Sequence, residues 1–367
     1  MELMENICKY DDVEVVFLNP RHNKFNKWCT ERGIENYSVN YVGQMYSKHD
    51  TGIKFWVKYM SYLLRYYFMN PFAIRKIERI FDIKSFDYIH SNTAIIDVGM
   101  RLSMRNHVKH IYHLREFGKE DMNFIPFRSN CYKMMDKYGG NFIAISDVIK
   151  NSWIQKGISS RKITRIYDGI KAAQFPVRES IFEGEQVKVA FCGSITPFKD
   201  QEQLINAFIQ MPGDERNGFI VDIWGAGKQS YVDNLIRKIK ENGLDDVIRF
   251  KGYSSNLYRE LYNYDVGVNC SNSEAFGRVT VEYMMAGLLV LASDTGANTE
   301  LLQDGLTGIL YQKADTSSLV NKLLWIKKNR KVCKSLAYNG CAYAKDNYSI
   351  EVNTVKFYKY YQTLMEE

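Results

Sequence analysis

The chain of 367 residues lacks the long apolar run that a membrane-spanning helix requires. A helix that crosses a bilayer needs about 20 consecutive apolar residues, and no stretch of the sequence approaches that length. The opening residues, MELMENICKYDD, are acidic and contain no apolar segment of the kind found in secretory signals. We therefore expect a cytoplasmic protein that does not cross a bilayer.

Patterns typical of disulfide frameworks and metal sites are also missing. The seven cysteines are scattered and include no CxxC pair, which favours free thiols in a reducing compartment. All six histidines lie within the first 113 residues, and none forms an HExxH-type ligand pair. Because the second half also lacks a DxD-type motif, we expect neither a metal ion nor a cofactor.

The net charge of +7 is distributed unevenly along the chain. Residues 1–175 hold 27 Lys and Arg against 18 Asp and Glu, a net charge of +9, whereas residues 176–367 carry −2. A basic half can serve nucleic acid, anionic lipid or a phosphorylated substrate. No motif of a nucleic-acid-binding fold accompanies it, so we expect no nucleic-acid partner.

Apolar strand patterns alternate with helical patterns along both halves of the chain. The expected strands cover residues 13–18, 38–42, 88–91, 110–114, 142–146, 163–167, 187–192, 219–224, 247–251, 266–270 and 288–292. Such alternation predicts parallel sheets with helices on both faces, and the length predicts two domains. We expect an α/β protein of GT-B architecture, in which two doubly wound, Rossmann-like domains face a cleft and helices end the chain.

The composition suggests where these domains begin and end. We expect an N-terminal domain over residues 1–170 and a polar linker over residues 171–186. A C-terminal domain follows over residues 187–348, and a last helix, residues 349–367, packs back on the N-terminal domain. Chains of this architecture usually begin with a strand and a Gly-rich loop, which we do not find in this sequence. The alternatives are a truncated chain, a misassigned start or a catalytically impaired protein.

One stretch of the second half, residues 271–300, predicts a binding pocket. Glu274 and Glu282 are separated by seven residues, and a turn containing Gly277 precedes a helical run that begins at Val279. Amide groups at a helix N-terminus favour an anion such as phosphate. Glu282, one turn into the helix, is placed to accept hydrogen bonds from a diol. Together these features predict a site for a sugar nucleotide.

The second half resembles the family-4 retaining glycosyltransferases over nearly its whole length. The motifs that carry the resemblance are EAFGRVTVE at 274–282, AGL at 286–288, SDTG at 293–296, Glu300, DGxxG at 304–308 and GSxxPxK at 193–199. In that family the first Glu lies near the hydroxyls of the donor sugar, the second Glu binds the ribose, and amides at 277–279 hold the diphosphate. The alternative interpretation is a solvated helix carboxylate at Glu282 and a simple turn at Gly277.

The resemblance implies a set of site residues. The donor-binding residues would be Gly193, Ser194, Lys199, Glu274, Phe276, Gly277, Arg278, Val279 and Glu282, and the catalytic residues would be His113, Lys199 and Glu274. The alternative for Lys199 is an ordinary surface lysine. The sequence departs from the family at Ser194, where an Arg is usual, and at Asp200, where a Gly is usual. Arg278 is a candidate for the second cation.

Two motifs of the first half resemble capsular and O-antigen polysaccharide transferases of the same family. They are YHLREF at 112–117 and IHSN at 89–92. The resemblance implies that His113 lies in the cleft by the donor sugar. It places Arg115, Glu116, His90 and Asn92 on the acceptor side. A buried histidine of the core is the alternative for His113.

Residues 54–81 are rich in basic and aromatic side chains and show a helical pattern, with an expected break at Asn70-Pro71. Basic residues favour an anionic leaflet, and aromatic rings suit the headgroup level. We interpret this segment as a peripheral membrane face near a lipid-linked acceptor. The alternative is an aromatic core helix with a solvated basic side.

These observations predict a glycosyltransferase that moves a sugar from a nucleotide-diphosphate donor to a lipid-linked or oligosaccharide acceptor. The resemblance implies retention of anomeric configuration and a role in capsular or cell-surface polysaccharide synthesis. Two alternatives stay open. One is a truncated, catalytically impaired homologue that binds a nucleotide sugar, and the other is a GT-B sugar-nucleotide epimerase.

Overall fold

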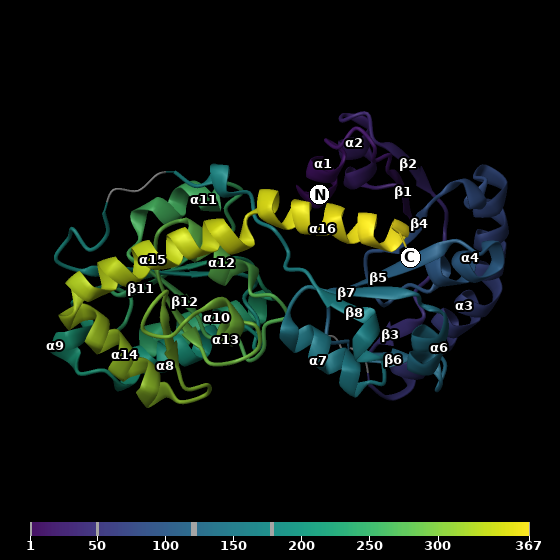
Figure 1. Ribbon diagram of the computed structural model, residues 1–367. Coiled ribbons are helices and arrows are strands. Elements are labelled where there is room, and N and C mark those ends of the chain that lie inside the picture. The colour runs from purple at the N-terminus through teal and green to yellow at the C-terminus, as the bar shows by residue number, and fades with distance from the viewer. Residues whose placement is uncertain (1, 49–50, 119–122, 177–179, 367) are drawn as a thin grey trace. The chain divides into compact units, whose positions relative to one another are not determined.

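The computed structural model describes residues 2–48, 51–118, 123–176 and 180–366. The chain divides into two compact units, Met1–Tyr167 with Thr354–Glu367, and Asp168–Asn353, which we call unit 1 and unit 2. In each of them, helices flank sheets of parallel strands (Figure 1). The predicted α/β fold class is confirmed.

Unit 2 is built on a parallel sheet with the strand order β11-β10-β9-β12-β13-β14. Its strands are β9 (Val187–Cys192), β10 (Phe219–Trp224), β11 (Ile248–Gly252), β12 (Val266–Asn269), β13 (Leu289–Ser293) and β14 (Ile309–Tyr311). The order reverses between β9 and β12, which are neighbours in the sheet. Doubly wound sheets bind their ligands at such a switch point, beyond the carboxyl ends of the strands.

Helices cover both faces of this sheet. They are α8 (Gln201–Gln210), α9 (Gly213–Arg216), α10 (Gln229–Glu241), α11 (Leu257–Glu260), α12 (Arg278–Met285), α13 (Asn298–Leu301), α14 (Thr316–Lys328) and α15 (Arg330–Tyr348). On one face, Val189 and Phe191 of β9 pack in a cluster with Leu204 of α8 and Leu323 of α14. On the other face, a Cβ at Gly267 of β12 would lie 2.2 Å from the ring of Tyr283, so α12 approaches closely.

Part of the stretch expected to be a linker contributes to the core of unit 2, which begins at Asp168. Ile181 and Phe182, within the stretch expected to be a linker, are buried in the same cluster as the strands. The amide of Phe182 donates a 2.5 Å hydrogen bond to Oδ1 of Asp265. The burial of Ile181 and Phe182 was not predicted, because the residues around Glu183 are polar. Two adjacent apolar residues are also too few to show a periodic pattern.

Unit 1 is built on a second parallel sheet with the order β4-β5-β7-β8. Its strands are β4 (Tyr88–Ser91), β5 (Lys109–Leu114), β7 (Asn141–Ala144) and β8 (Ile163–Arg165). Two small sheets pair β1 (Val16–Asn19) with β2 (Glu35–Ser38) and β3 (Met45–Ser47) with β6 (Phe124–Pro126). The helices are α1 (Glu2–Ile7), α2 (Lys24–Thr30), α3 (Gly52–Ile80), α4 (Val98–Asn106), α6 (Cys131–Tyr138) and α7 (Asp147–Gln155).

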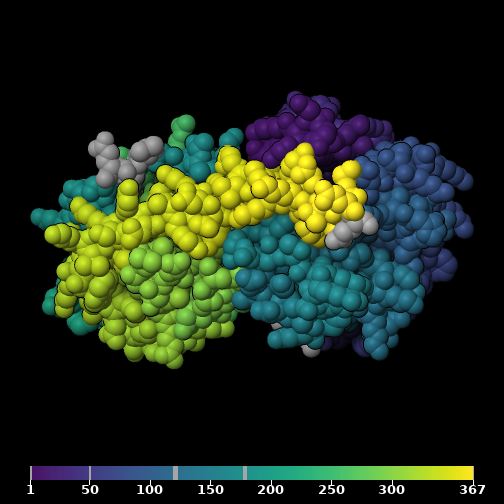
Figure 2. All heavy atoms as spheres, viewed as in Figure 1, coloured from purple at the N-terminus to yellow at the C-terminus, as the bar shows by residue number. Residues whose placement is uncertain are grey.

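The last helix, α16 (Ile350–Glu366), belongs to unit 1 from Thr354 onward. Phe357 and Leu364 are buried in one cluster with Ile111 of β5, Ile143 of β7 and Ile166. The space-filling view shows the end of this yellow segment lying on the blue residues of unit 1 (Figure 2). Apolar side chains from the end of the chain therefore complete the cover of this sheet.

The expected break at Asn70-Pro71 is wrong, because α3 continues through Pro71 to Ile80. A proline inside a helix removes one backbone hydrogen bond and costs about 3 kcal/mol. Tertiary contacts offset this cost. The side chain of Asn70 accepts a 3.0 Å hydrogen bond from the amide of Val42 and donates a 2.9 Å bond to its carbonyl. Ile74 and Ile77 are buried one turn later.

Candidate functional site

Two glycine turns meet at the carboxyl ends of β9 and β10. Gly193 and Gly225 have φ values of 142° and 145°, which L side chains rarely adopt. A Cβ at Gly225 would lie 1.8 Å from the carbonyl oxygen of Gly193, so the two backbones touch. The amide of Ile195 then bonds to the carbonyl of Ala226 at 2.9 Å. These contacts hold the loop that carries Ser194 and leads to Lys199.

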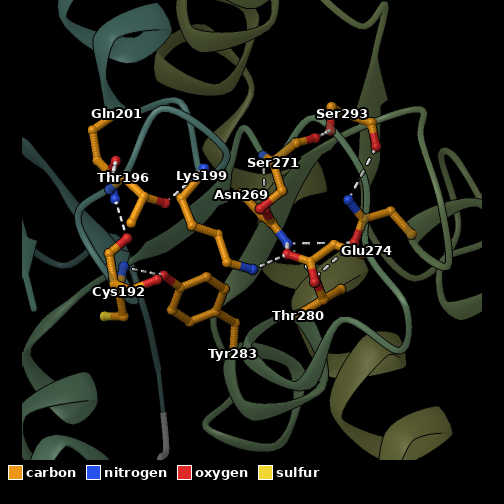
Figure 3. A network of polar contacts seen from close by, with 12 residues as sticks. Cys192, Thr196, Lys199, Gln201, Asn269, Ser271, Glu274, Thr280, Tyr283 and Ser293 are labelled. Atoms are coloured by element: carbon orange, nitrogen blue, oxygen red, sulfur yellow. Dashed lines mark hydrogen bonds and ion pairs between the residues drawn. The ribbon is translucent and has the colours of Figure 1, made fainter. Parts of the chain in front are cut away.

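The structure brings Lys199 and Glu274 together across the switch point. Nζ of Lys199 lies 2.5 Å from Oε1 of Glu274 (Figure 3). The lysine side chain is 22 % exposed and the carboxylate 9 %, so this ion pair is partly shielded from water. Lys199 follows β9 and Glu274 follows β12, and the pair therefore joins the ends of two neighbouring strands.

A network of buried, hydrogen-bonded side chains positions Glu274. Nδ2 of Asn269, at the end of β12, donates to Oε1 of Glu274 at 3.3 Å and to Oγ1 of Thr280 at 2.9 Å. The hydroxyl of Thr280 donates in turn to Oδ1 of Asn298 at 2.8 Å. A Cβ at Gly296 would lie 2.4 Å from the amide nitrogen of Glu274. The loops after β12 and β13 therefore fix both the backbone and the carboxylate of Glu274.

The turn between Glu274 and α12 places a helix N-terminus beside this carboxylate. Gly277 is the N-cap residue with φ 77°, and Arg278 begins the helix. The partial positive charge of a helix N-terminus favours an anion, in line with the role expected for the backbone at 277–279. The side chain of Phe276 is buried and lies edge-on to Tyr348, so toward a ligand this residue offers only its backbone.

Glu282 lies one turn into α12 and forms an ion pair on the same helix. Nε of Arg278 lies 2.9 Å from its Oε1, and the guanidinium side chain is 47 % exposed against 11 % for the carboxylate. The cation expected to contact phosphate is thus bound to the carboxylate expected to contact ribose. Both predicted donor carboxylates, Glu274 and Glu282, therefore have a basic partner.

The two histidines predicted in unit 1 lie close together beneath α16. The ring of His113, at the end of β5, lies 5.4 Å from the ring of His90 and 5.3 Å from that of Phe357. Burial, reinforced by Arg115, holds the pKa of His113 well below its ordinary value. Burial also lowers the pKa of His90 to about 3. His113 is fully buried, and its neutral ring lies against Phe357 of the C-terminal helix.

The other three candidates of unit 1 organise the loops after β4 and β5. Oε1 of Glu116 accepts hydrogen bonds from the hydroxyl of Thr93 at 2.6 Å and from the amide of Ala94 at 2.9 Å. The guanidinium of Arg115 donates to Oδ1 of Asn92 at 3.3 Å. Glu116 is buried, whereas the Arg115–Asn92 contact is exposed. The structure therefore brings these residues to one edge of the sheet, with Glu116 bracing the loop.

Several residues of this site were not predicted from the sequence. Asn269, Thr280 and Asn298 support Glu274, and the hydroxyl of Tyr283 accepts a 2.6 Å hydrogen bond from the amide of Cys192. One signal was available, since Asn269 is a polar residue that ends an apolar strand. Within the described ranges, no group of three or more His, Cys, Asp or Glu side chains is arranged to hold a metal ion.

Comparisons with known proteins show what the domain that carries this site is similar to. Residues 175–342 match the family of glycosyl transferases group 1. The chain is 23 % identical to an uncharacterized glycosyltransferase of Methanocaldococcus jannaschii, over 98 % of this chain and 88 % of that protein. It is 29 % identical to the lipopolysaccharide core biosynthesis mannosyltransferase LpsB of Rhizobium meliloti, over 37 % of this chain and 39 % of that protein.

A solved structure matches both units. The crystal structure of Anabaena HepE in complex with UDP has a TM-score of 0.79, with 19 % identity over 98 % of this chain and 95 % of that chain. Identity at this level shows the fold alone, and it confirms the predicted architecture. The protein has the GT-B fold, and its residues 175–342 are similar to the glycosyl transferases group 1 family.

Proposed function

We propose that this protein transfers a sugar from a nucleoside diphosphate donor to a lipid-linked or oligosaccharide acceptor. The observation that carries the proposal is the ion pair of Lys199 with Glu274, beside the N-terminus of α12 and at the switch point of the sheet. An ammonium group next to a helix N-terminus suits a diphosphate, and an adjacent carboxylate suits sugar hydroxyls.

The two ion pairs suggest how the donor enters. A diphosphate carries more negative charge than a carboxylate, so it would draw the ammonium of Lys199 away from Glu274. The carboxylate of Glu274 would then accept hydrogen bonds from the donor sugar. Ribose hydroxyls would likewise replace the guanidinium of Arg278 at Glu282. Each cation would move from a carboxylate to a phosphate oxygen, so the negative charge of the diphosphate would meet two cations while the carboxylates accept hydrogen bonds from neutral hydroxyls.

The proposed reaction retains the anomeric configuration. The acceptor hydroxyl forms a bond to the anomeric carbon on the face from which the diphosphate departs, and its proton passes to a departing phosphate oxygen. Lys199 and the amides at the start of α12 stabilise the negative charge that develops on the diphosphate. No metal ion or cofactor takes part. His113 has a positioning role in this proposal, because it lies buried beneath Phe357.

We further propose that the acceptor belongs to capsular or other cell-surface polysaccharide synthesis, at the cytoplasmic face of the membrane. Two sequence similarities support this acceptor class. One is the likeness of the motifs around His90 and His113 to polysaccharide transferases, and the other is the similarity to the mannosyltransferase LpsB. None of the helices in the described ranges is both long and apolar enough to cross a bilayer.

Calorimetry with nucleoside diphosphates tests the binding site. UDP comes first, because the structural neighbour HepE was solved with UDP. Glu282→Ala should weaken binding by about 5- to 150-fold, since a lost partner of a buried hydroxyl costs about 1–3 kcal/mol. Glu241→Ala is a matched control, because Glu241 forms an exposed i,i+4 pair with Arg237 on α10. Equal affinities of the two variants would place the nucleotide elsewhere.

Incubation with nucleotide sugars tests the reaction. A transferase should release nucleoside diphosphate and extend a lipid-linked oligosaccharide, and the product linkage should keep the anomeric configuration of the donor. Formation of an epimer without acceptor would instead identify an epimerase. Tight binding of several nucleotide sugars without turnover of any would identify a non-catalytic homologue.

A further inference from the structure

Helix α3 is anchored to unit 1 by one of its faces. The residues buried on this face are Phe55, Tyr66, Asn70, Ala73, Ile74 and Ile77. The hydroxyl of Tyr66 donates a 2.6 Å hydrogen bond to Oδ2 of Asp97, and the side chain of Asn70 bonds to both backbone groups of Val42. These contacts fix the rotation of α3 about its axis and so determine which side chains face away from the protein.

The opposite face of α3 exposes a stripe of apolar side chains. Its members recur at spacings of three and four residues, and their exposed fractions lie between 45 % and 83 %: Ile53, Val57, Met60, Leu64 and Phe68. Trp56, Tyr67 and Phe72 are exposed beside them. Residues at this spacing share one side of a helix. Soluble proteins rarely expose a contiguous apolar surface of this kind unless it binds something.

Basic side chains follow one flank of this apolar stripe. Lys54, Lys58, Arg65 and Lys76 lie at spacings of 4, 7 and 11 residues, which bring them to the same side of the helix. The acid of α3, Glu78, is bound by Arg105 at 2.8 Å. Beyond Pro71 the stripe leads to a hollow of about 290 Å³, whose lining includes Arg75 and also Arg101, which is paired with Asp97 at 2.7 Å. The basic flank and Arg75 therefore place positive charge along the apolar surface.

We propose that the apolar stripe of α3 docks on the surface of an anionic lipid bilayer. The helix would lie parallel to the membrane, with the stripe in the interfacial region and the basic flank at the headgroups. An apolar face with aromatic residues and a lysine-rich border is typical of helices that lie in this plane. Figure 1 shows α3 beside α4 in unit 1.

This proposal deepens the proposed function, because the stripe would bring the protein to a lipid-linked acceptor. It also refines the expectation for residues 54–81. The buried face of α3 belongs to the core, and the face opposite to it would meet the lipid. Apolar insertion would provide most of the affinity, and the basic flank would select anionic lipid. Membrane binding itself does not require turnover, so it can be tested independently of the reaction.

Flotation with vesicles tests the proposal on the full-length protein. Vesicles of phosphatidylcholine with phosphatidylglycerol should bind the wild type more tightly than vesicles of phosphatidylcholine alone. Leu64→Ser should weaken binding to both about tenfold, since it removes apolar surface from the interface. Leu306→Ser in unit 2 is the matched control, because Leu306 is 51 % exposed and Leu64 is 52 % exposed. The control should bind vesicles as the wild type does.

A charge variant separates the contribution of the basic flank. Lys76→Gln should weaken binding to the anionic vesicles about fivefold and leave binding to neutral vesicles unchanged, since one lysine near an anionic surface contributes about 1 kcal/mol. Lys240→Gln on α10, also exposed, should change neither. Equal loss of binding on both vesicle types would contradict the role given to the flank.

Two results would overturn the proposal. One is equal vesicle binding by Leu64→Ser and Leu306→Ser. The other is a dimer in lipid-free light scattering that Leu64→Ser dissociates, because a second copy of the chain would then cover the stripe. Both variants should keep the wild-type affinity for nucleotide. A protein that binds vesicles through Leu64 but transfers no sugar would refute the proposed reaction and leave this surface in place.

Discussion

The two units place polar residues at the same edge of their sheets, yet the two sites differ in charge. In unit 2, Lys199 and Glu274 form a partly exposed ion pair beside a helix N-terminus. In unit 1, His90 and His113 are neutral rings beneath α16. The carboxyl edge of a parallel sheet favours a site, but burial and charge decide what each residue does there. In the proposed function the ion pair exchanges partners with an anion, whereas His90 and His113 lie packed against Tyr361 and Phe357 of α16.

The contrast begins with the distribution of histidine. All six histidines precede residue 114, so unit 2 contains none. In unit 1, His110 joins the buried group: it bonds to Oγ of Ser91 at 2.9 Å and to the carbonyl of Gly139 at 2.7 Å. Burial lowers its pKa to about 4. The two units should therefore respond differently to acid.

The largest predicted effect is a loss of stability at low pH that is greater in unit 1 than in unit 2. In the unfolded chain the pKa of histidine is about 6.5, and folding lowers the pKa of His90 to about 3 and that of His110 to about 4. Below pH 6.5 the unfolded state binds protons that the folded state does not. The free energy of unfolding therefore decreases as the pH is lowered. The loss is about 1.4 kcal/mol per pH unit for each histidine, and the stability is fully present above that pH.

Hydrogen exchange measured by mass spectrometry on peptides of each unit checks this prediction. Protection in β5 and β7 should decrease between about pH 6.5 and pH 4, while protection in β9 and β12 should change less. His110→Gln should reduce the steepness of the loss, and the exposed His22 serves as a control in His22→Gln. A parallel loss of protection in both units would contradict the assignment of acid sensitivity to the buried histidines.

The next effect contrasts Lys199 with His113 in catalysis. Lys199→Met should lower kcat about 100-fold, because it removes a cation from the developing charge of the leaving diphosphate. Lys238→Met is a matched control, since Lys238 also lies 2.5 Å from a carboxylate, that of Glu202.

His113→Ala should instead lower the free energy of unfolding by about 2 kcal/mol or more, because it leaves a cavity beneath Phe357. Steady-state kinetics and urea titrations measure the two quantities.

Two results would contradict this comparison. If His113→Ala kept its stability and lost kcat as strongly as Lys199→Met, the buried ring would reach the donor, and α16 would have to move to admit it. If Lys199→Met and Lys238→Met had the same kcat, the ion pair with Glu274 would be structural. Either result would reverse the assignment of chemistry to unit 2.

Local sequence patterns predicted much of the fold and those features of the site that lie within a few residues of one another. The strand at 187–192 and the helical run after Gly277 were predictable, because periodicity and turn residues act over a few positions. The spacing from Glu274 to Glu282 is likewise local, since one loop and one helical turn connect the two residues.

Contacts between distant segments were not predictable from such patterns. Lys199 and Glu274 lie 75 positions apart in the chain, and only the strand order brings them together. The network of Asn269, Thr280 and Asn298 depends on the same arrangement. The continuity of α3 through Pro71 depends on the anchor between Asn70 and Val42, which no helical pattern records. The cover over His113 comes from Phe357, near the end of the chain.

The smallest predicted effect concerns the ion pair on α12. Arg278→Gln should change the free energy of unfolding by only about 0.3–0.5 kcal/mol, because an i,i+4 pair with a half-exposed guanidinium contributes little. Arg237→Gln on α10 removes an exposed pair of the same spacing and should have the same small effect. The two variants should differ in UDP affinity, which Arg278→Gln lowers if the guanidinium moves to phosphate. Calorimetry measures the UDP affinities, and urea titrations measure the free energies of unfolding. Equal UDP affinities of the two variants would leave Lys199 as the cation that binds phosphate. Arg278 would then serve only to neutralise Glu282.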